Sequence, residues 1–177
     1  MNTMAVALMA LALPVQVPME PAKDLFMHSA KAPGMEIRFV DYHWQPALWE
    51  AMEKGSRTIP EATRNWVVVR VVLDDRPLTL EGTRLAVGNY GLLLWPNLDG
   101  KGMAYEMRRI DMREVYPDVN AIAPSPRGET VYKGPAKFTA GNPLASRFNV
   151  AVGSEDPAQV TLTIGYGDRR LVLTFVR

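Results

Sequence analysis

Apolar and polar residues alternate along much of this chain, and the alternation predicts β-strands. In residues 36–42, Ile37 and Phe39 alternate with Glu36 and Arg38. Successive side chains of a strand point to opposite faces of a sheet, so each such segment offers one apolar face to a core. The same period of two recurs in residues 103–108, 147–152, 160–166 and 171–176. The pattern predicts an all-β fold.

Two further segments are more hydrophobic than simple alternation requires. In residues 65–73 the odd-numbered positions from Val67 to Leu73 form a fully apolar face, whereas the other face is mixed and contains Arg70. Residues 90–95 are apolar on both faces. A strand of that kind is typical of the centre of a sheet that is covered on both sides.

Turn residues separate the predicted strands. Gly82 lies between two short apolar segments, and Gly-Asp at 167–168 separates the last two strands. Gly88-Asn89 predicts a tight hairpin before the strand at 90–95, because such turns need positive φ angles that Gly and Asn tolerate. Residues 109–129 have no clear period and contain three prolines, which predicts a long loop that is either functional or mobile.

One helix is expected, at residues 46–54. Pro46 suits the first helical position, Gly55 suits the position just past the end, and Leu48 and Met52 lie one turn apart. About eight short strands, turn signals between them and one short helix predict an antiparallel β-sandwich. We expect a single domain over residues 35–177.

The N-terminus predicts export. Residues 4–13 (MAVALMALAL) form an uncharged apolar run of about ten residues, too short to span a bilayer but suited to the core of a signal peptide. Ala10-Leu11-Ala12 has the small-x-small pattern of a cleavage site. We therefore predict a signal peptide at 1–12, a linker rich in Pro and Ala at 13–34, and a periplasmic or secreted location. The alternative is that the run is a buried first strand or helix.

Composition excludes several classes of function. The 177 residues contain 20 basic and 19 acidic side chains, and this balance gives no electrostatic signature of nucleic-acid binding. There is no cysteine, so disulfides, thiolate nucleophiles and cysteine-based metal sites are excluded. No segment is long and apolar enough to predict an integral membrane span.

Residues 78–91 (LTLEGTRLAVGNYG) resemble the core of a bacterial family known as domain of unknown function 2911. The family's Leu-x-x-Gly-x-Tyr-Gly-Leu pattern and a later proline fall on Leu85, Gly88, Tyr90, Gly91, Leu92 and Pro96. The resemblance covers roughly residues 35–177 and implies an exported, all-β bacterial protein with no established reaction, cofactor or catalytic residue. The family's Trp-Arg-x-Gly-Ala-Asn-Glu stretch has no counterpart at 57–66 (RTIPEATRNW), so no role of that stretch is transferred. Leu-x-x-Gly-x-Tyr also resembles structural turns of prealbumin-like and other Greek-key sandwiches.

The candidates for catalysis are few. The two histidines are His28 and His43, and Asp41 would share a strand face with His43, but no metal-binding spacing supports a metal site. No serine lies in a Gly-x-Ser-x-Gly turn that would position a nucleophile. We therefore predict no catalytic residue, no metal and no cofactor.

The candidates for ligand binding are Tyr42, His43, Trp44, Trp49 and Arg109. The aromatic residues gather where the first strand leads into the helix, and exposed Tyr and Trp can stack on sugars or anchor a partner. The alternative is that they pack the helix onto the sheet. Arg109, at the start of the predicted loop, could recognise an anion, or form part of a salt-bridged surface.

Two functions follow from these observations. The first is an exported, non-enzymatic binding or envelope-associated module for a small molecule, a glycan or a protein. The second is a hydrolase acting on cell-envelope or carbohydrate material, with His43 and a loop carboxylate as acid and base. The hydrolase would hold His43 in a pocket, hydrogen-bonded to a second titratable group, whereas the binder would present aromatic residues on a concave face.

Overall fold

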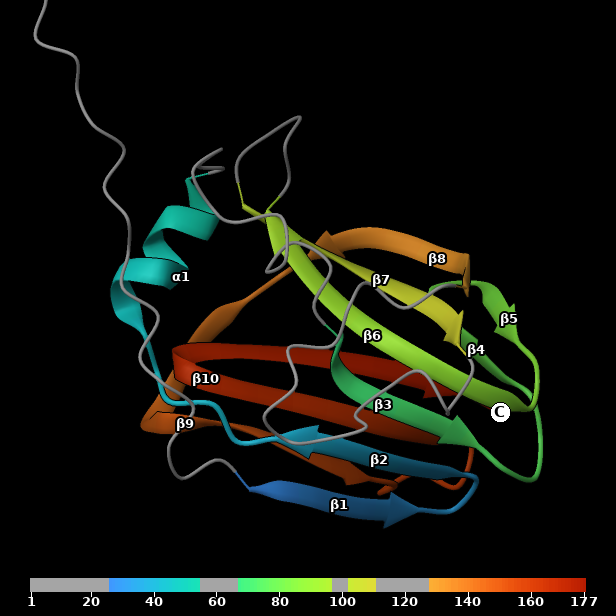
Figure 1. Ribbon diagram of the computed structural model, residues 1–177. Helices are drawn as coiled ribbons and strands as arrows, with labels where there is room; N and C mark the ends of the chain where they lie inside the picture. Colours follow the sequence, from blue (N-terminus) through green and yellow to red (C-terminus); the bar gives the residue numbers. More distant parts are fainter. Residues whose placement is uncertain (1–25, 55–66, 97–101, 111–127) are drawn as a thin grey trace, which may run out of the picture.

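Two antiparallel sheets stack face to face, with one helix at an end of the sandwich (Figure 1). The computed structural model describes residues 26–54, 67–96, 102–110 and 128–177. The six-stranded sheet has the order β1 (Met27–Ala32), β2 (Met35–Val40), β3 (Val67–Leu73), β6 (Gly88–Pro96), β7 (Met103–Ile110), β8 (Gly128–Ala136). The four-stranded sheet has the order β5 (Thr83–Leu85), β4 (Leu78–Leu80), β10 (Gln159–Val176), β9 (Thr139–Gly153). The helix is α1 (Pro46–Glu53). The predicted all-β sandwich with one short helix is confirmed.

The core lies between the two sheets and is built from the apolar face of each strand. Phe39, Val69, Leu92 and Phe175 are all buried there. β6 is also buried on its outer face, where Leu93 packs with Val67 and Ile110 in a separate small cluster. The prediction of a central strand covered on both sides is therefore confirmed.

The predicted apolar face of residues 65–73 needs a correction at its start. Val69 pairs with Leu92 and Val67 with Leu93, so β3 has a register irregularity between these two valines. The irregularity turns Val67 to the outer face and lets Val68 join the core. A bulge of this kind changes the face of each residue before it, and strict alternation cannot predict it.

The chain reverses at two of the predicted turns. Glu81 and Gly82, with φ of 48° and 79°, connect β4 to β5, and two positive φ angles are what a type I′ turn requires. β10 folds back on itself, since the N–H of Arg177 donates to the carbonyl of Ala158 at 2.9 Å. Gly167, with φ of 60°, lies midway, and Figure 1 shows the two halves of β10 side by side. The predicted reversal at 167–168 is confirmed.

Gly88-Asn89 does not form the predicted hairpin. β5 and β6 belong to different sheets, and both residues are already part of β6, where they pair with β3. The chain therefore crosses between the sheets at this point. The hydroxyl of buried Tyr90 donates to the carbonyl of Ala86 at 2.7 Å. A tyrosine bonded to the backbone a few residues upstream is a tyrosine corner, a recurrent feature of β-sandwiches, so the fold accounts for this motif.

Two edge strands were not predicted. Residues 27–32, assigned to the linker, form β1 and pair with β2 from Met27↔Val40 to Ala32↔Met35. The predicted loop at 109–129 begins within β7 and ends within β8, so Arg109 and Glu129 are paired strand residues. Both strands are largely exposed and lack a regular apolar face. The predicted signal peptide at 1–12, the rest of the linker up to residue 25 and residues 111–127 lie outside the described residues.

The segment after β2 brings α1 to the end of the sandwich. The N–H of Trp44 donates to the carbonyl of Ser146 at 2.9 Å, and the N–H of Phe148 donates to the carbonyl of Tyr42 at 2.7 Å. His43 forms a β-bridge with Arg147 between these two bonds. These contacts join the segment that follows β2 of one sheet to β9 of the other. Within the described part of the chain, no helix has the length and hydrophobicity needed to cross a membrane.

Candidate functional site

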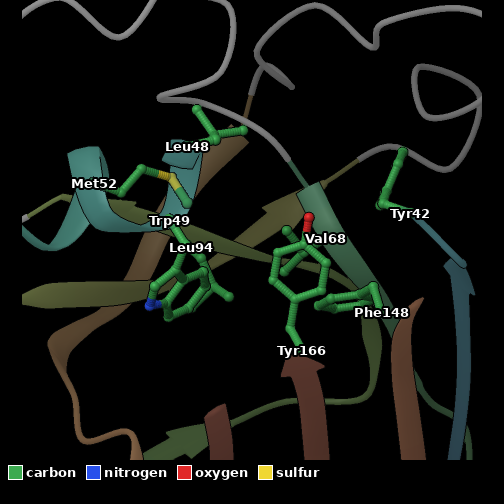
Figure 2. Close-up of a pocket in the computed structure, with 8 residues that line it drawn as sticks. All are labelled: Tyr42, Leu48, Trp49, Met52, Val68, Leu94, Phe148 and Tyr166. Carbon is green, nitrogen blue, oxygen red and sulfur yellow. The ribbon is translucent and has the colours of Figure 1, made fainter. Parts of the chain in front are cut away.

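A cavity of about 40 Å³ lies where α1 meets the two sheets (Figure 2). α1 supplies three of its lining residues, and β3, β6, β9, β10 and the segment after β2 each supply one. The described lining residues are all apolar or aromatic: Tyr42, Leu48, Trp49, Met52, Val68, Leu94, Phe148 and Tyr166. These described residues can therefore exchange dispersion contacts with a ligand, and none of them offers it a charge.

The helix forms one wall of this cavity. Pro46 occupies the start of α1, where its missing N–H costs nothing. Leu48, Trp49 and Met52 then fall on one face because residues three and four apart are neighbours on a helix. Trp49 is the buried residue of α1, at 3% exposure. The predicted helix at 46–54 and its apolar face are confirmed.

Tyr166 is the centre of the aromatic cluster beside the cavity. Its ring centroid lies 4.7 Å from that of Trp44 and 5.8 Å from those of Trp49 and Phe148, with near-perpendicular or steeply tilted planes. Edge-to-face pairs at such distances add to the stability that burial alone provides. The Tyr166 hydroxyl donates to the carbonyl of His43 at 2.6 Å. Burial raises the pKa of Tyr166 to about 12, so the group is neutral and already hydrogen-bonded.

The structure brings together four of the five predicted binding residues, in different roles. Tyr42 and Trp49 line the cavity. Trp44 is half-buried and packs behind the cavity, on Tyr166 and over Gly167. His43 contributes its backbone and does not line the cavity. Trp44 and Trp49 therefore pack the helix against β10, as the alternative interpretation of the aromatic residues expects.

Arg109 does not join this cluster. It is exposed and pairs with Tyr90 in the ladder between β6 and β7, and its guanidinium lies over Gly88. The β6 residue that lines the cavity is Leu94, four positions further along the strand. At a rise of about 3.4 Å per residue, Arg109 is separated from the cavity by about 14 Å along the sheet. The assignment of Arg109 to a loop was therefore wrong, whereas its role in recognising an anion stays a prediction.

The side chain of His43 has no hydrogen bond or ion pair to any described residue. Asp41, which was expected to share a face with His43, instead accepts hydrogen bonds from the backbone N–H of Phe26 at 2.6 Å and from Nη1 of Arg147 at 2.9 Å. Nε2 of His28 lies 3.4 Å from the same carboxylate. Over the described ranges, no group of three or more potential ligands could hold a metal ion.

Asp41 thus connects β1 of one sheet to β9 of the other, a role that sequence reasoning missed. Burial alone would raise the pKa of Asp41, but the hydrogen bonds from Phe26, His28 and Arg147 together lower it below its ordinary value of 3.8. The only sequence signal was an acidic residue at the end of an apolar strand. Its partners lie 15 and 106 residues away along the chain, beyond the reach of a local pattern.

We predict that Asp41→Asn removes part of the acid sensitivity of folding. A carboxylate with a lowered folded-state pKa contributes stability above its unfolded pKa of 3.8, and that contribution is lost as the pH falls through the folded-state value. Urea unfolding from pH 6 to pH 2.5 measures this. The difference in stability between wild type and Asp41→Asn should shrink below about pH 4. A difference that stays constant with pH would show that Asp41 is not held in its charged form.

A second ion pair fastens the end of α1 to the sandwich. Nε and Nη2 of Arg169, at the turn of β10, donate to the two carboxylate oxygens of Glu53 at 3.0 and 3.2 Å. Arg169 also pairs with Asp168 at 2.8 Å. The hydrogen bond from Arg169 lowers the pKa of Glu53. The buried N–H of Trp49 faces the same carboxylate without a hydrogen bond of normal geometry and lowers that pKa further.

Half of the described lining residues could not be identified as such from the sequence. Val68, Leu94, Phe148 and Tyr166 come from four different strands, and each belongs to an ordinary alternating or apolar segment. Alternation indicates that such side chains face the core. Which of them meet at the same end of the sandwich depends on strand order and register, and neither is visible in the sequence.

No protein-family model, no curated protein and no solved structure matches this chain. The resemblance of residues 78–91 to domain of unknown function 2911 therefore stays a prediction.

Proposed function

We propose that this protein is an exported, non-enzymatic binding module that holds a small apolar group in the cavity beneath α1. The observation that carries the proposal is the chemistry of the cavity wall, where every described lining side chain is apolar or aromatic. Apolar cavities in proteins stay dry and bind apolar molecules such as benzene or xenon. Burying an ion or an unpaired polar group there would cost free energy, because the described lining side chains present an almost entirely apolar surface to it.

The placement of the rings favours an apolar ligand over a glycan. Stacking on a sugar requires an exposed aromatic face, whereas Trp49 is buried and the ring of Trp44 lies against Tyr166 and Gly167. The one hydroxyl at the centre of the cluster, on Tyr166, is already bonded to His43. The ligand is therefore recognised by shape and hydrophobicity.

The hydrolase alternative lacks the feature on which it depended. That hypothesis required His43 to lie in a pocket and to be hydrogen-bonded to a second titratable group. Among the described residues, His43 does not line the cavity, and Asp41 pairs with His28 instead. The cluster of His28, Asp41 and Arg147 is the nearest equivalent, but the described contacts of Asp41 join strands and place no nucleophile beside it.

Export is the part of the proposal that rests on residues 4–13. It predicts that protein recovered from its host has lost about the first twelve residues, which an intact-mass measurement detects. Retention of Met1 in protein from the cytoplasm would contradict export and leave the binding proposal standing.

The binding proposal is tested with xenon, an apolar probe smaller than benzene. Xenon under pressure should shift the NMR signal of the Met52 methyl group, since Met52 lines the cavity. Leu48→Phe should abolish the shift by filling the cavity. Val172→Phe, on the exposed face of β10, is the matched control and should bind xenon as wild type does. An unchanged Met52 signal in wild type would overturn the proposal.

A further inference from the structure

We propose that α1 is a movable gate of this cavity and that the Glu53–Arg169 ion pair is the latch that keeps it closed. This inference rests on the proposed function, because it concerns how an apolar ligand reaches the same cavity. It adds that the closed structure is the resting state and that ring-sized ligands require the helix to move.

The size of the cavity requires movement. It measures about 40 Å³, whereas an apolar cavity that accommodates benzene measures about 150 Å³. Any ligand with a ring must therefore displace part of the wall. Val68, Leu94, Phe148 and Tyr166 lie on hydrogen-bonded strands, and Tyr42 is bonded through its backbone to β9. The other described lining residues, Leu48, Trp49 and Met52, belong to α1.

The helix is the weakest part of that wall. It has eight residues, and helices shorter than about 12 residues depend on tertiary contacts for their stability. Gln45 precedes it without a side-chain hydrogen bond to the helix, and Trp49 is the residue that α1 buries. Trp49, whose ring packs on Phe138 and Tyr166, anchors the first half of the helix. The second half, with Met52, can move away from the sheets while Trp49 stays in place.

The Glu53–Arg169 pair holds the C-terminal end of α1 against β10. Glu53 lies one turn after Trp49, and its carboxylate receives two hydrogen bonds from Arg169 of β10. Its carbonyl also accepts the N–H of Gly102 at 3.1 Å. The Glu53 and Arg169 side chains are 33% and 31% exposed, so solvent screens their attraction. A pair of this kind shifts an equilibrium by about two- to fivefold, which is strong enough to favour the closed state and weak enough to yield to a ligand.

Glu53→Gln tests the latch. Benzene binding, followed through the Met52 methyl signal, should become about two- to fivefold tighter in Glu53→Gln, because less free energy opposes the displacement of α1. Raising the salt concentration should have the same effect on wild type and little effect on the variant. In the free protein, the amide of Lys54 should exchange with deuterium faster in Glu53→Gln, whereas the amides of β10 should not.

Two matched controls isolate the contact that matters. Glu50→Gln removes the ion pair with Lys54, which lies within the helix region and does not reach the sandwich. Asp168→Asn removes the other partner of Arg169 and leaves the latch in place. Both should bind benzene as wild type does. Equal benzene affinity in Glu53→Gln and Glu50→Gln, or no benzene binding to any variant that binds xenon, would overturn the gate and leave the proposed function intact. Failure of xenon to bind would overturn the proposed function itself.

Discussion

Trp49→Ala should lower the free energy of unfolding by about 3–5 kcal/mol, which is the usual cost of truncating a fully buried tryptophan. Trp49 is 3% exposed, and its ring contacts Trp44, Phe138 and Tyr166. Removing the indole leaves a void beside an existing cavity, and the strands around it are too well paired to collapse into it. Urea unfolding, followed by far-UV circular dichroism, measures the loss.

Trp95→Ala is the matched control, because it removes the same side chain from a different environment. Trp95 is half-buried on β6, outside the cavity lining, with the ammonium of Lys133 4.6 Å from the ring centroid. Its loss should cost about 1–2 kcal/mol, from partial burial and one cation–π contact. Equal losses for the two variants would mean that Trp49 does not anchor α1 in the core.

The parts of the fold that the sequence could predict are those in which burial is visible locally. β2, β7 and both halves of β10 alternate because one face of each meets the core, and α1 shows its apolar face through Leu48 and Met52. The turn at Glu81-Gly82 follows from the backbone angles that glycine permits. In these segments the local preference and the tertiary structure agree.

The elements that were missed are stabilised by partners far along the chain. β1 and β8 are edge strands, so hydrogen bonds to one neighbour hold them and few of their side chains are buried. The crossing at Gly88 contains the same residue types as a hairpin. The separation of the two sheets, with β5 in one and β6 in the other, decides between the two, and it is a property of the whole fold.

The candidate site divides in the same way. Tyr42 and Trp49 could be predicted because aromatic residues gather beside the helix in the sequence itself. The position of Arg109, away from these residues, could not be predicted, because it depends on the β6–β7 register that pairs it with Tyr90. Phe148 and Tyr166 were missed as lining residues for the related reason that the segment after β2 crosses to β9. Register and crossing points are therefore the information that the sequence lacks.

Gly167→Ala should destabilise the protein by about 2–4 kcal/mol, from two separate causes. With φ of 60°, Gly167 has a left-handed backbone that costs other residues about 1 kcal/mol. A Cβ there would also lie between 2.2 and 2.5 Å from three ring atoms of Trp44, so the indole would have to move. Overpacking of this kind costs about 1–3 kcal/mol. The turn thus uses glycine both to reverse the chain and to seat Trp44.

Gly82→Ala separates the two causes. Gly82 has φ of 79°, and a Cβ there would meet no atom within 4 Å, so this variant should lose only the backbone contribution of about 1 kcal/mol. In a Trp44→Ala background, the cost of Gly167→Ala should fall to the same value, because the clashing ring is absent. Urea midpoints of the four variants and wild type complete the cycle. If Gly167→Ala lowers the free energy of unfolding no more than Gly82→Ala does, Trp44 does not pack on this turn. The aromatic cluster behind the cavity would then be packed differently from the arrangement on which the gate depends.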